Sequence, residues 1–400
     1  MTLGEAFATV TGNTPPKNNA DFYGDFIPLV KPPELCDVPF DSAEDGLSES
    51  GAAIARTLPP RSILVSCIGN LGKIGLNTVP VAFNQQINAI LPDERQAIPE
   101  FMFFQVLSPT FKEQLESLAS GTTVPIVNKS KFNSIGIVLP ALSEQRRIVG
   151  ILDEAFEGLA TAKANAEQNL QNARALFESH LQAVFTQRGD GWVEKQLGDI
   201  CDRVSVGHVG ETSKFYCEAE DGIPFLRSQN VRRGFIDLDG IRHITKAFHQ
   251  KLKKSQLRPG DLLFVRVGAN RGDCSFLPND LGEINCANIV FARPTDGNAE
   301  YLSRYCQSPD GRSQLLGMSV GSAQGVINTS SVAELVVPSP SIREQLRIVE
   351  LLNLVEEETQ RLESLYQRKL AALDELKKSL LHRAFSGQLT SGTVSQEVTS

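Results

Sequence analysis

Two long segments of the chain place apolar residues three and four positions apart, which is the spacing of a helix with one apolar side. They occupy residues 143–187 and 341–386, contain no proline, and open with "EQRRIV" (144–149) and "EQLRIV" (344–349). A helix of about 43 residues is ~65 Å long, and it needs another helix to cover its apolar side. We therefore predict that the two segments pair as a coiled coil.

The apolar positions define the seam of this coiled coil. An antiparallel arrangement about an internal pseudo-twofold axis brings a small side chain opposite a large one in four layers, as close packing requires. The layers are Ala155 with Leu373, Ala162 with Tyr366, Ala166 with Leu362, and Ala173 with Val355. The complete predicted seam consists of Ile148, Leu152, Ala155, Ala162, Ala166, Leu170 and Ala173 in the first helix and Ile348, Leu352, Val355, Leu362, Tyr366, Leu370 and Leu373 in the second.

The two helices belong to an internal repeat with an offset of about 200 residues. "GTTVPIVN" (121–128) aligns with "GSAQGVIN" (321–328), and "DFIPLVK" (25–31) resembles "DGIPFLR" (221–227). A repeat of this extent predicts two similar globular domains, each followed by a long helix. The predicted boundaries are 1–142 and 188–340 for the domains, 143–187 and 341–386 for the helices, and 387–400 for a disordered tail.

Each globular block is predicted to be a mixed α/β (α+β) domain. "RSILVSCIG" and "DLLFVRVG" are short β-rich runs that end in glycine turns. In each block a helical stretch is interrupted by a central Ser-Pro. "KFNSIGIVLP" (131–140) and "SVAELVVPSP" (331–340) are predicted to be final strands that end at proline. Ser143 and Ser341 are the predicted N-caps of the long helices, with Glu344 completing a capping box.

Composition excludes several classes of protein. The apolar runs are too short to span a bilayer, and the N-terminal sequence lacks the pattern of a signal peptide, so we predict a cytoplasmic protein. The seven cysteines are scattered without a C-x-x-C pair, and the five histidines lie at no zinc-ligand spacing from them. We therefore predict reduced thiols and no metal site.

The charge of the chain is unevenly placed. The net charge is −8, and residues 1–142 hold 9 basic and 14 acidic side chains, whereas residues 188–342 hold 18 of each. "LRSQNVRRGF" and "KLKKSQLR" are basic clusters within the second block. Because phosphate contacts need Lys and Arg, this distribution is compatible with DNA binding but predicts that the chain alone binds DNA weakly.

Catalytic motifs are missing from the sequence. "IGNLGKIG" (68–75) differs from a phosphate-binding loop, because Cys67 replaces the first glycine and Ile74 replaces Ser or Thr. The Pro-Pro pairs lack the flanking residues of an amino-methyltransferase box, and the acidic stretches "PDERQ" and "SPDGR" lack the second acid and lysine of a nuclease site. We predict a chain that is not an enzyme, with no catalytic residues.

Polar loop residues suited to reading bases remain. Arg and Lys pair with guanine, and Asn and Gln pair with adenine, in the major groove. The same residues are also typical of solvated loops, so the set is more informative than any single member. The predicted DNA-binding residues are Lys31, Asn70, Lys73, Asn84, Gln85, Gln86, Asn128 and Lys129 in the first block and Arg227, Gln229, Asn230, Arg232, Arg233, Arg266, Asn270, Arg271 and Asn288 in the second.

These motifs together resemble a known family over nearly the whole chain. "G-x-T-P-P…YGDFIPLVK" (12–31), "ILVSCIGNLGKIGL", "FNQQINAI" and "LHRAFSGQL" (381–389), with the paired "EQ-x-R-I-V" openings, are similar to the DNA-specificity (S) subunits of Type I restriction–modification systems. The second block departs from the pattern, since "GHVGETSKFYC" stands where the "T-P" signature is expected.

The resemblance implies a division of labour among several subunits. Each domain would read one half of a bipartite, asymmetric site in double-stranded DNA, and the coiled coil would set the unread spacer. Two methyltransferase (M) subunits would bind around the helices, and restriction (R) subunits would join them. The chain itself would use no cofactor, whereas its partners would use S-adenosylmethionine, ATP and Mg. The Glu, Gln and Arg of the two helix openings would hold the neighbouring domain or receive partners, and the structural role is favoured.

Three alternatives stay open at the level of sequence. The first is a self-contained restriction or methylation enzyme, against which the missing motifs argue. The second is a coiled-coil scaffold that joins two protein-binding domains, against which the basic, Asn- and Gln-bearing loops argue. The third is a specificity subunit of another restriction class, which neighbouring genes would decide.

Overall fold

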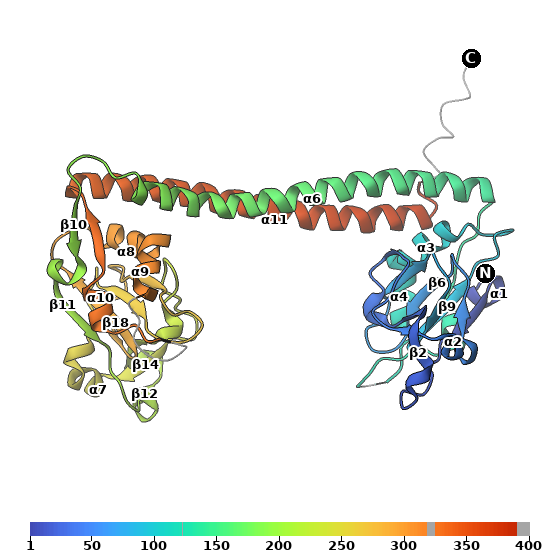
Figure 1. The fold of residues 1–400 in the computed structure, drawn as a ribbon, viewed down its shortest axis with the longest axis horizontal. Coiled ribbons are helices and arrows are strands. Elements are labelled where there is room, and N and C mark those ends of the chain that lie inside the picture. The colour runs from blue at the N-terminus through green and yellow to red at the C-terminus, as the bar shows by residue number, and fades with distance from the viewer. Residues whose placement is uncertain (122, 318–324, 390–400) are drawn as a thin grey trace, which may run out of the picture. The chain divides into compact units, whose positions relative to one another are not determined.

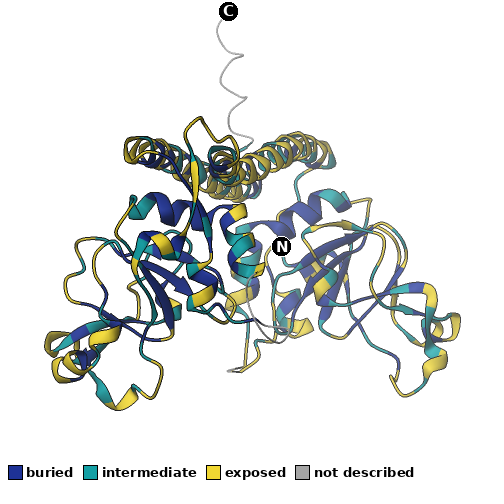
Figure 2. Ribbon diagram, turned by 60° about the vertical axis from the view of Figure 1, so that its left-hand side comes forward, coloured by how far each residue is buried: buried dark blue, intermediate teal, exposed yellow. Residues whose placement is uncertain are grey.

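The computed structural model describes residues 1–121, 123–317 and 325–389. The chain divides into two compact units, Met1–Glu167 with Arg368–Ser400, and Gln168–Gln367. Each unit therefore combines one globular domain with parts of both long helices, so that the helices are shared between the units rather than forming separate domains. The elements are drawn in Figure 1, and Figure 2 shows that the strands of both domains are largely buried whereas the outer turns of the long helices are exposed.

The first domain is built on two sheets. One has the strand order β1-β9-β6-β7-β3, and the other has the order β4-β2-β8-β5 with a parallel β2–β8 pair. The strands are β1 (Ala8–Thr11), β2 (Tyr23–Val30), β3 (Val38–Phe40), β4 (Gly46–Leu47), β5 (Thr57–Leu58), β6 (Ile63–Ser66), β7 (Ile74–Asn77), β8 (Val81–Phe83) and β9 (Ile87–Leu91). The helices are α1 (Leu3–Ala6), α2 (Glu49–Ile54), α3 (Pro99–Leu107), α4 (Pro109–Ser117) and α5 (Lys129–Asn133).

Helices α3 and α4 enclose the core of the first domain. The predicted Ser-Pro interruption lies between them, where Ser108 has extended dihedral angles and its hydroxyl accepts a hydrogen bond from the Phe111 amide (3.3 Å). Proline disfavours a helical conformation at the residue before it, which ends α3, and the serine then caps α4. Phe101 of α3 and Phe111 of α4 are buried with Ile63 and Val65 of β6 in one apolar cluster.

The second domain repeats this layout. Its sheets have the orders β11-β18-β15-β16 and β12-β14-β13-β17, the second with a parallel β13–β17 pair, and β10 pairs with β19. The strands are β10 (Val193–Gln196), β11 (Cys201–Val206), β12 (Tyr216–Cys217), β13 (Gly222–Leu226), β14 (Arg242–Thr245), β15 (Leu262–Val265), β16 (Cys274–Phe276), β17 (Asn285–Cys286), β18 (Ile289–Pro294) and β19 (Val336–Ser339). The helices are α7 (Lys246–Lys251), α8 (Ala299–Gln307), α9 (Pro309–Gly317) and α10 (Thr329–Ala333).

The long helices are α6 (Leu142–Thr186) and α11 (Ile342–Phe385), and they run antiparallel within each unit. All fourteen predicted seam residues are buried or half-buried. Thr359, which the apolar pattern leaves out, is also buried in α11. The Ser341 hydroxyl accepts from the Glu344 amide (3.4 Å), but the Glu344 carboxylate pairs with Arg347 instead of completing a capping box. Ser143 does not cap α6, because the helix begins one residue earlier.

The register of the two helices differs from the predicted one by about one turn. The prediction places Leu152 opposite Leu376, whereas Leu152 shares a cluster with Leu381, and Leu376 is 47% exposed. Farther along the pair, Leu181 shares a cluster with Leu352, although the predicted register would place it opposite Arg347. The prediction assumed that small seam residues face large ones, and the contacts of the helix ends with the two domain cores override that preference.

Two further predictions need correction. The stretch 131–140 was expected to hold a final strand, yet among the described residues its one bridge is Thr2 opposite Gly136, whereas its counterpart β19 has β10 as a full partner. A strand needs a neighbour to satisfy its backbone groups, and this stretch lacks one of comparable length. Residues 387–389, expected in a disordered tail, form a turn in which the Leu389 amide donates to Arg383 (3.2 Å). The rest of the predicted tail, 390–400, lies outside the described residues.

Candidate nucleic-acid interface

One edge of the first domain gathers all eight residues predicted there. Strands β2 and β8 are parallel, with Val30 beside Phe83, so that Lys31 and Asn84 follow them at the same end. The Asn84 amide donates to the Val30 carbonyl (3.0 Å), which fixes the two exits side by side. We call this end of the domain the first reading edge and define it by Lys31 and by the loops 67–73, 84–86 and 127–129.

Backbone contacts join these loops into a continuous surface. The Cys67 amide donates to the Gln86 carbonyl (2.8 Å), and the Cys67 carbonyl accepts from the Val127 amide (2.8 Å). The loop that follows β6 therefore lies between loop 84–86 and segment 127–129. It turns through Gly69 and Gly72, whose φ angles of 78° and 73° favour glycine. Asn70 and Lys73 are thereby placed on the same edge as Lys31.

The side chains of the first reading edge differ in their solvent exposure and in their hydrogen-bond partners. Asn70, Gln85 and Lys129 are exposed, and the Gln85 amide oxygen accepts from the Thr14 hydroxyl (3.1 Å). Asn84 is 8% exposed, and its side-chain nitrogen donates to the side-chain oxygen of Gln86 (3.0 Å). Asn84 therefore stabilises the turn rather than facing solvent. Asn128 caps α5, while Lys31 is paired with Asp45.

The second domain builds the same edge with different side chains. The Ala287 amide donates to the Leu226 carbonyl (2.9 Å), and the Ile327 amide donates to the Arg266 carbonyl (3.2 Å), in the positions of the contacts described for the first domain. We define the second reading edge by Arg227, Gln229, Arg266 and Asn288. Gln229 and Asn288 are exposed, and Asn288 adopts a left-handed backbone (φ 54°) that turns the chain into β18.

Two residues of the predicted set serve the fold instead. Asn230 is 1% exposed; its side-chain oxygen accepts from the Arg227 amide (3.1 Å), and its side-chain nitrogen donates to the Asp237 carbonyl (2.9 Å). Arg233 pairs with Glu178 of α6 (2.7 Å) and donates to the Gln307 carbonyl (2.5 Å). The Asn230 side chain is therefore bound within its own loop, and Nη2 of Arg233 is held by α6 and by the end of α8.

The remaining arginines of the second edge are half-buried. Arg266 donates to the Ile327 carbonyl (3.3 Å) and Arg271 to the Gly325 carbonyl (2.5 Å). Asn270 precedes Arg271 in the turn between β15 and β16. Arg232 lies 3.9 Å from Asp237. Nε of Arg227 and Nη1 of Arg232 are buried donors without a hydrogen-bond partner within the part of the chain that the structure describes. A buried donor without a partner lowers the stability of the folded chain, and an acceptor on a ligand would supply the missing hydrogen bond.

Sequence reasoning missed one residue on each edge. Thr14 contacts Gln85, and His208 donates its amide to the Cys286 carbonyl (2.9 Å) beside Asn288. Each loop contains a glycine that tolerates no side chain, because a Cβ on Gly12, two residues before Thr14, would lie 2.2 Å from the Asn84 carbonyl oxygen, and one on Gly207, next to His208, would lie 2.7 Å from Cys286 Sγ. The alignment of "GNTPP" (12–16) with "GHVG" (207–210) is the sequence signal that would have found both loops.

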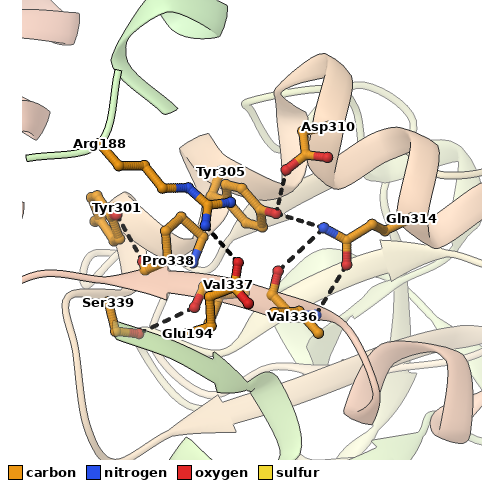
Figure 3. Close-up of polar contacts among 10 residues, drawn as sticks. All are labelled: Arg188, Glu194, Tyr301, Tyr305, Asp310, Gln314, Val336, Val337, Pro338 and Ser339. Carbon is orange, nitrogen blue, oxygen red and sulfur yellow. Dashed lines mark hydrogen bonds and ion pairs between the residues drawn. The ribbon is translucent and has the colours of Figure 1, made fainter. Parts of the chain in front are cut away.

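In the second domain the helix pair α8–α9 is fastened to β19, the strand that leads into α11, as Figure 3 shows. The Tyr301 hydroxyl donates to the Pro338 carbonyl (2.8 Å), and Gln314 both accepts from the Val336 amide (3.1 Å) and donates to the Tyr305 hydroxyl (2.7 Å). Burial raises the pKa of Tyr305, so its phenol stays protonated and donates to Asp310 (2.8 Å). In the first domain Gln114 holds the Gly136 backbone in the same way.

The first reading edge contains one cysteine thiol, that of Cys67. Burial raises the pKa of the Cys67 thiol to about 12, which keeps it protonated at the first reading edge. The searched part of the chain, which leaves out 122, 318–324 and 390–400, holds no group of three His, Cys, Asp or Glu residues that would bind a metal ion. In the same residues no helix is apolar and long enough to cross a membrane.

Comparison with known families identifies the family to which the chain belongs. The family model of the Type I restriction modification DNA specificity domain matches residues 1–171 and again residues 189–369. The chain therefore belongs to this family and carries two copies of its domain. This confirms the resemblance seen in the sequence, and because the family is one of specificity domains, it confirms the prediction that the chain is not an enzyme.

Individual relatives agree with this assignment. The Type I restriction enzyme HindI specificity subunit of Haemophilus influenzae is 35% identical over 162 residues, which are 38% of this chain and 35% of that protein. The EcoKI specificity subunit of Escherichia coli is 24% identical over 396 residues, which are 92% of this chain and 83% of that protein.

Two solved structures share the fold. A chain from a study of complex assembly and conformational transition of the type I R-M system has a TM-score of 0.78 at 20% identity, with 97% of both chains covered. The HsdS subunit from Thermoanaerobacter tengcongensis has a TM-score of 0.63 at 20% identity, covering 97% of this chain and 96% of that one. The predicted fold class, tandem α/β domains with two long helices, is confirmed.

Proposed function

We propose that this chain is the sequence-reading subunit of a Type I restriction–modification complex, in which each reading edge contacts one half of a bipartite site in double-stranded DNA. The observation that carries the proposal is the repeated edge: the same backbone contacts present different side chains, such as Gln85 in one domain and Asn288 in the other. Two edges with one geometry suit two half-sites, and unlike side chains suit unlike sequences.

A basic hollow supports phosphate contact beside the second reading edge. A cavity of about 650 Å³ is lined by His208, Lys251, Lys253 and Lys254 among others. Phosphate contacts fix a protein on the duplex and leave base readout to neighbouring side chains. The acidic balance of the whole chain, −8, limits such contacts, so partner subunits supply the rest.

The long helices offer a surface for the methyltransferase subunits. Leu351, Leu354 and Leu365 are 43%, 58% and 48% exposed, and helical periodicity places them on one face of α11 outside the seam. An exposed apolar row on a charged helix is typical of a contact surface. In this proposal methylation and cleavage belong to the partners, which bind S-adenosylmethionine, ATP and Mg, and this chain binds no cofactor.

Leu354→Glu is expected to weaken binding of the methyltransferase subunit about tenfold or more, because the contact would bury an unpaired charge. Titration calorimetry with the purified subunit measures the effect. Gln360→Glu is the matched control, since this exposed residue lies on another face of the same helix. Equal affinity of the Leu354→Glu variant and the unaltered chain would contradict the proposed docking face.

Single replacements at the edges are expected to change one half-site each. Gln85→Ala should relax base preference in the half-site read by the first domain by about 1–3 kcal/mol, and Asn288→Ala should do so in the other half-site. Methylation rates on duplexes substituted at each position measure both. A variant that relaxes both half-sites together, or neither, would argue against one edge per half-site.

The proposal as a whole is tested by selection from a random duplex pool. The chain with methyltransferase subunits should recover two different short sequences at a fixed separation, and the chain alone should bind weakly. Recovery of a single uninterrupted sequence, or of none, would refute the proposed function.

A further inference from the structure

The first turn of each long helix contains a glutamine that is almost completely buried. Gln145 and Gln345 are 0% and 5% exposed, and they occupy the same place in "EQRRIV" and "EQLRIV". Their neighbours in the motif behave differently, because Glu144 pairs with Arg147 (2.8 Å) and Glu344 with Arg347 (2.7 Å) on the outside of the helix. These guanidinium partners lower the pKa of both carboxyl groups and leave the glutamines as the inward-facing members of the motif.

Each glutamine ties three segments together. The Gln145 side-chain oxygen accepts from the Ile98 amide (2.8 Å), and its nitrogen donates to the Pro140 and Gln96 carbonyls (both 2.9 Å). Ile98 is the residue immediately before α3, and Pro140 precedes α6. One side chain therefore fixes the start of the long helix to the start of the domain helix and to the segment that leaves the domain.

The second unit repeats the arrangement. The Gln345 side-chain oxygen accepts from the Asn298 amide (2.8 Å), and its nitrogen donates to the Pro340 carbonyl (2.9 Å). Asn298 stands immediately before α8 as Ile98 does before α3. The two sites thus share the bonds to the residue before the domain helix and to the proline before the long helix, and Gln145 adds a bond to Gln96.

We propose that Gln145 and Gln345 are positioning residues that make the complex discriminate between spacer lengths. The inference rests on the proposed function, in which two edges read one duplex. Adding a base pair to the spacer moves a half-site by about 3.4 Å and turns it by roughly 35° about the duplex axis. A domain fastened rigidly to its long helix cannot follow that turn, whereas a domain with a loosened joint follows it. The glutamines touch neither reading edge, so base preference does not depend on them.

The test uses Gln145→Met and Gln345→Met, which keep the side-chain volume and remove the hydrogen bonds. The full chain is assembled with methyltransferase subunits and given duplexes with the two selected half-sites at the preferred spacer and at one base pair more or less. We expect the preference for the preferred spacer to fall about tenfold, or about 1.4 kcal/mol, with base preference unchanged. Arg347→Ala, which breaks the exposed ion pair in the same turn, should leave the preference as it was.

Wild-type spacer preference in both methionine variants would overturn the inference, and so would a loss of base preference with spacer preference intact. Amide hydrogen exchange gives an independent reading: the Ile98 and Asn298 amides should lose protection in the respective variants while α3 and α8 keep theirs. Retained protection at both amides would also overturn it. Failure of the unaltered chain to direct methylation to paired half-sites would instead refute the proposed function itself, which separates the two ideas.

Discussion

Four residues inserted into both α6 and α11 are expected to move methylation to sites whose spacer is one or two base pairs longer, with both half-sites unchanged. Four residues add a rise of about 6 Å and a turn of about 40° to a helix. One base pair adds about 3.4 Å and roughly 35° to a duplex, so the added rise corresponds to nearly two base pairs and the added turn to about one. Insertions of four residues unwind a coiled coil locally and keep its seam.

Suitable positions follow from the observed register. Insertions after Asn169 in α6 and after Ser364 in α11 fall at the same level of the pair, close to the Arg174–Glu363 ion pair. Methylation of a duplex series with stepwise longer spacers measures the outcome. An insertion in α6 alone is the control, because it shifts one side of the seam and should abolish methylation at every spacer. An unchanged spacer in the double insertion would show that the helices do not set the distance.

Arg304→Ala is expected to lower the free energy of unfolding of the chain by about 3 kcal/mol. The Arg304 side chain is 9% exposed and lies in α8, where it pairs with Glu356 (2.5 Å) and donates to Asn353 (2.8 Å), both in α11. Breaking a buried ion pair leaves a charge without its partner at a cost of about 3–5 kcal/mol. Glu356 is a third exposed, which places the expected value at the lower end of that range.

The internal repeat supplies the matched control for Arg304. The corresponding residues in the other unit are Phe104 and Phe156, whose rings lie 5.5 Å apart in an edge-on contact. The double variant Arg304→Phe with Glu356→Phe should therefore recover most of the stability, because it copies an aromatic contact that the fold already uses. Denaturant unfolding of the three chains measures both effects. A neutral Arg304→Ala variant, or a double variant less stable than Arg304→Ala, would contradict this view of the joint.

The sequence predicts the long helices well because their signal is strong and local. The apolar spacing locates α6 and α11 to within about a residue of where the structure places them, 142–186 and 342–385, and the Ser-Pro pair marks the break between α3 and α4. Repetition adds long-range information, since it identifies which residues of the two domains correspond. The reading edges follow from that correspondence, because the loops after β6 and β15 and before β9 and β18 are recognisable in both blocks.

Register and partner choice are set by contacts that no local pattern contains. The shift of one turn along the seam arises where Leu152 packs with Leu381 in the first unit and Leu181 packs with Leu352 in the second, inside clusters that include domain residues. The same reason explains Arg233, which has the chemistry of a DNA contact but lies within reach of Glu178. Asn230 is likewise taken up by backbone groups of its own loop. The type of a polar residue indicates which groups its side chain can bind. Which of those groups lie within its reach is determined by the fold.

The most direct test of the account is a map of methylated adenines in DNA from cells that express this chain with methyltransferase subunits. The account predicts methylation at a bipartite site with two unlike half-sites and one fixed spacer, absent when this chain is omitted. Methylation at a palindromic or uninterrupted sequence, or the same methylation pattern without this chain, would contradict it.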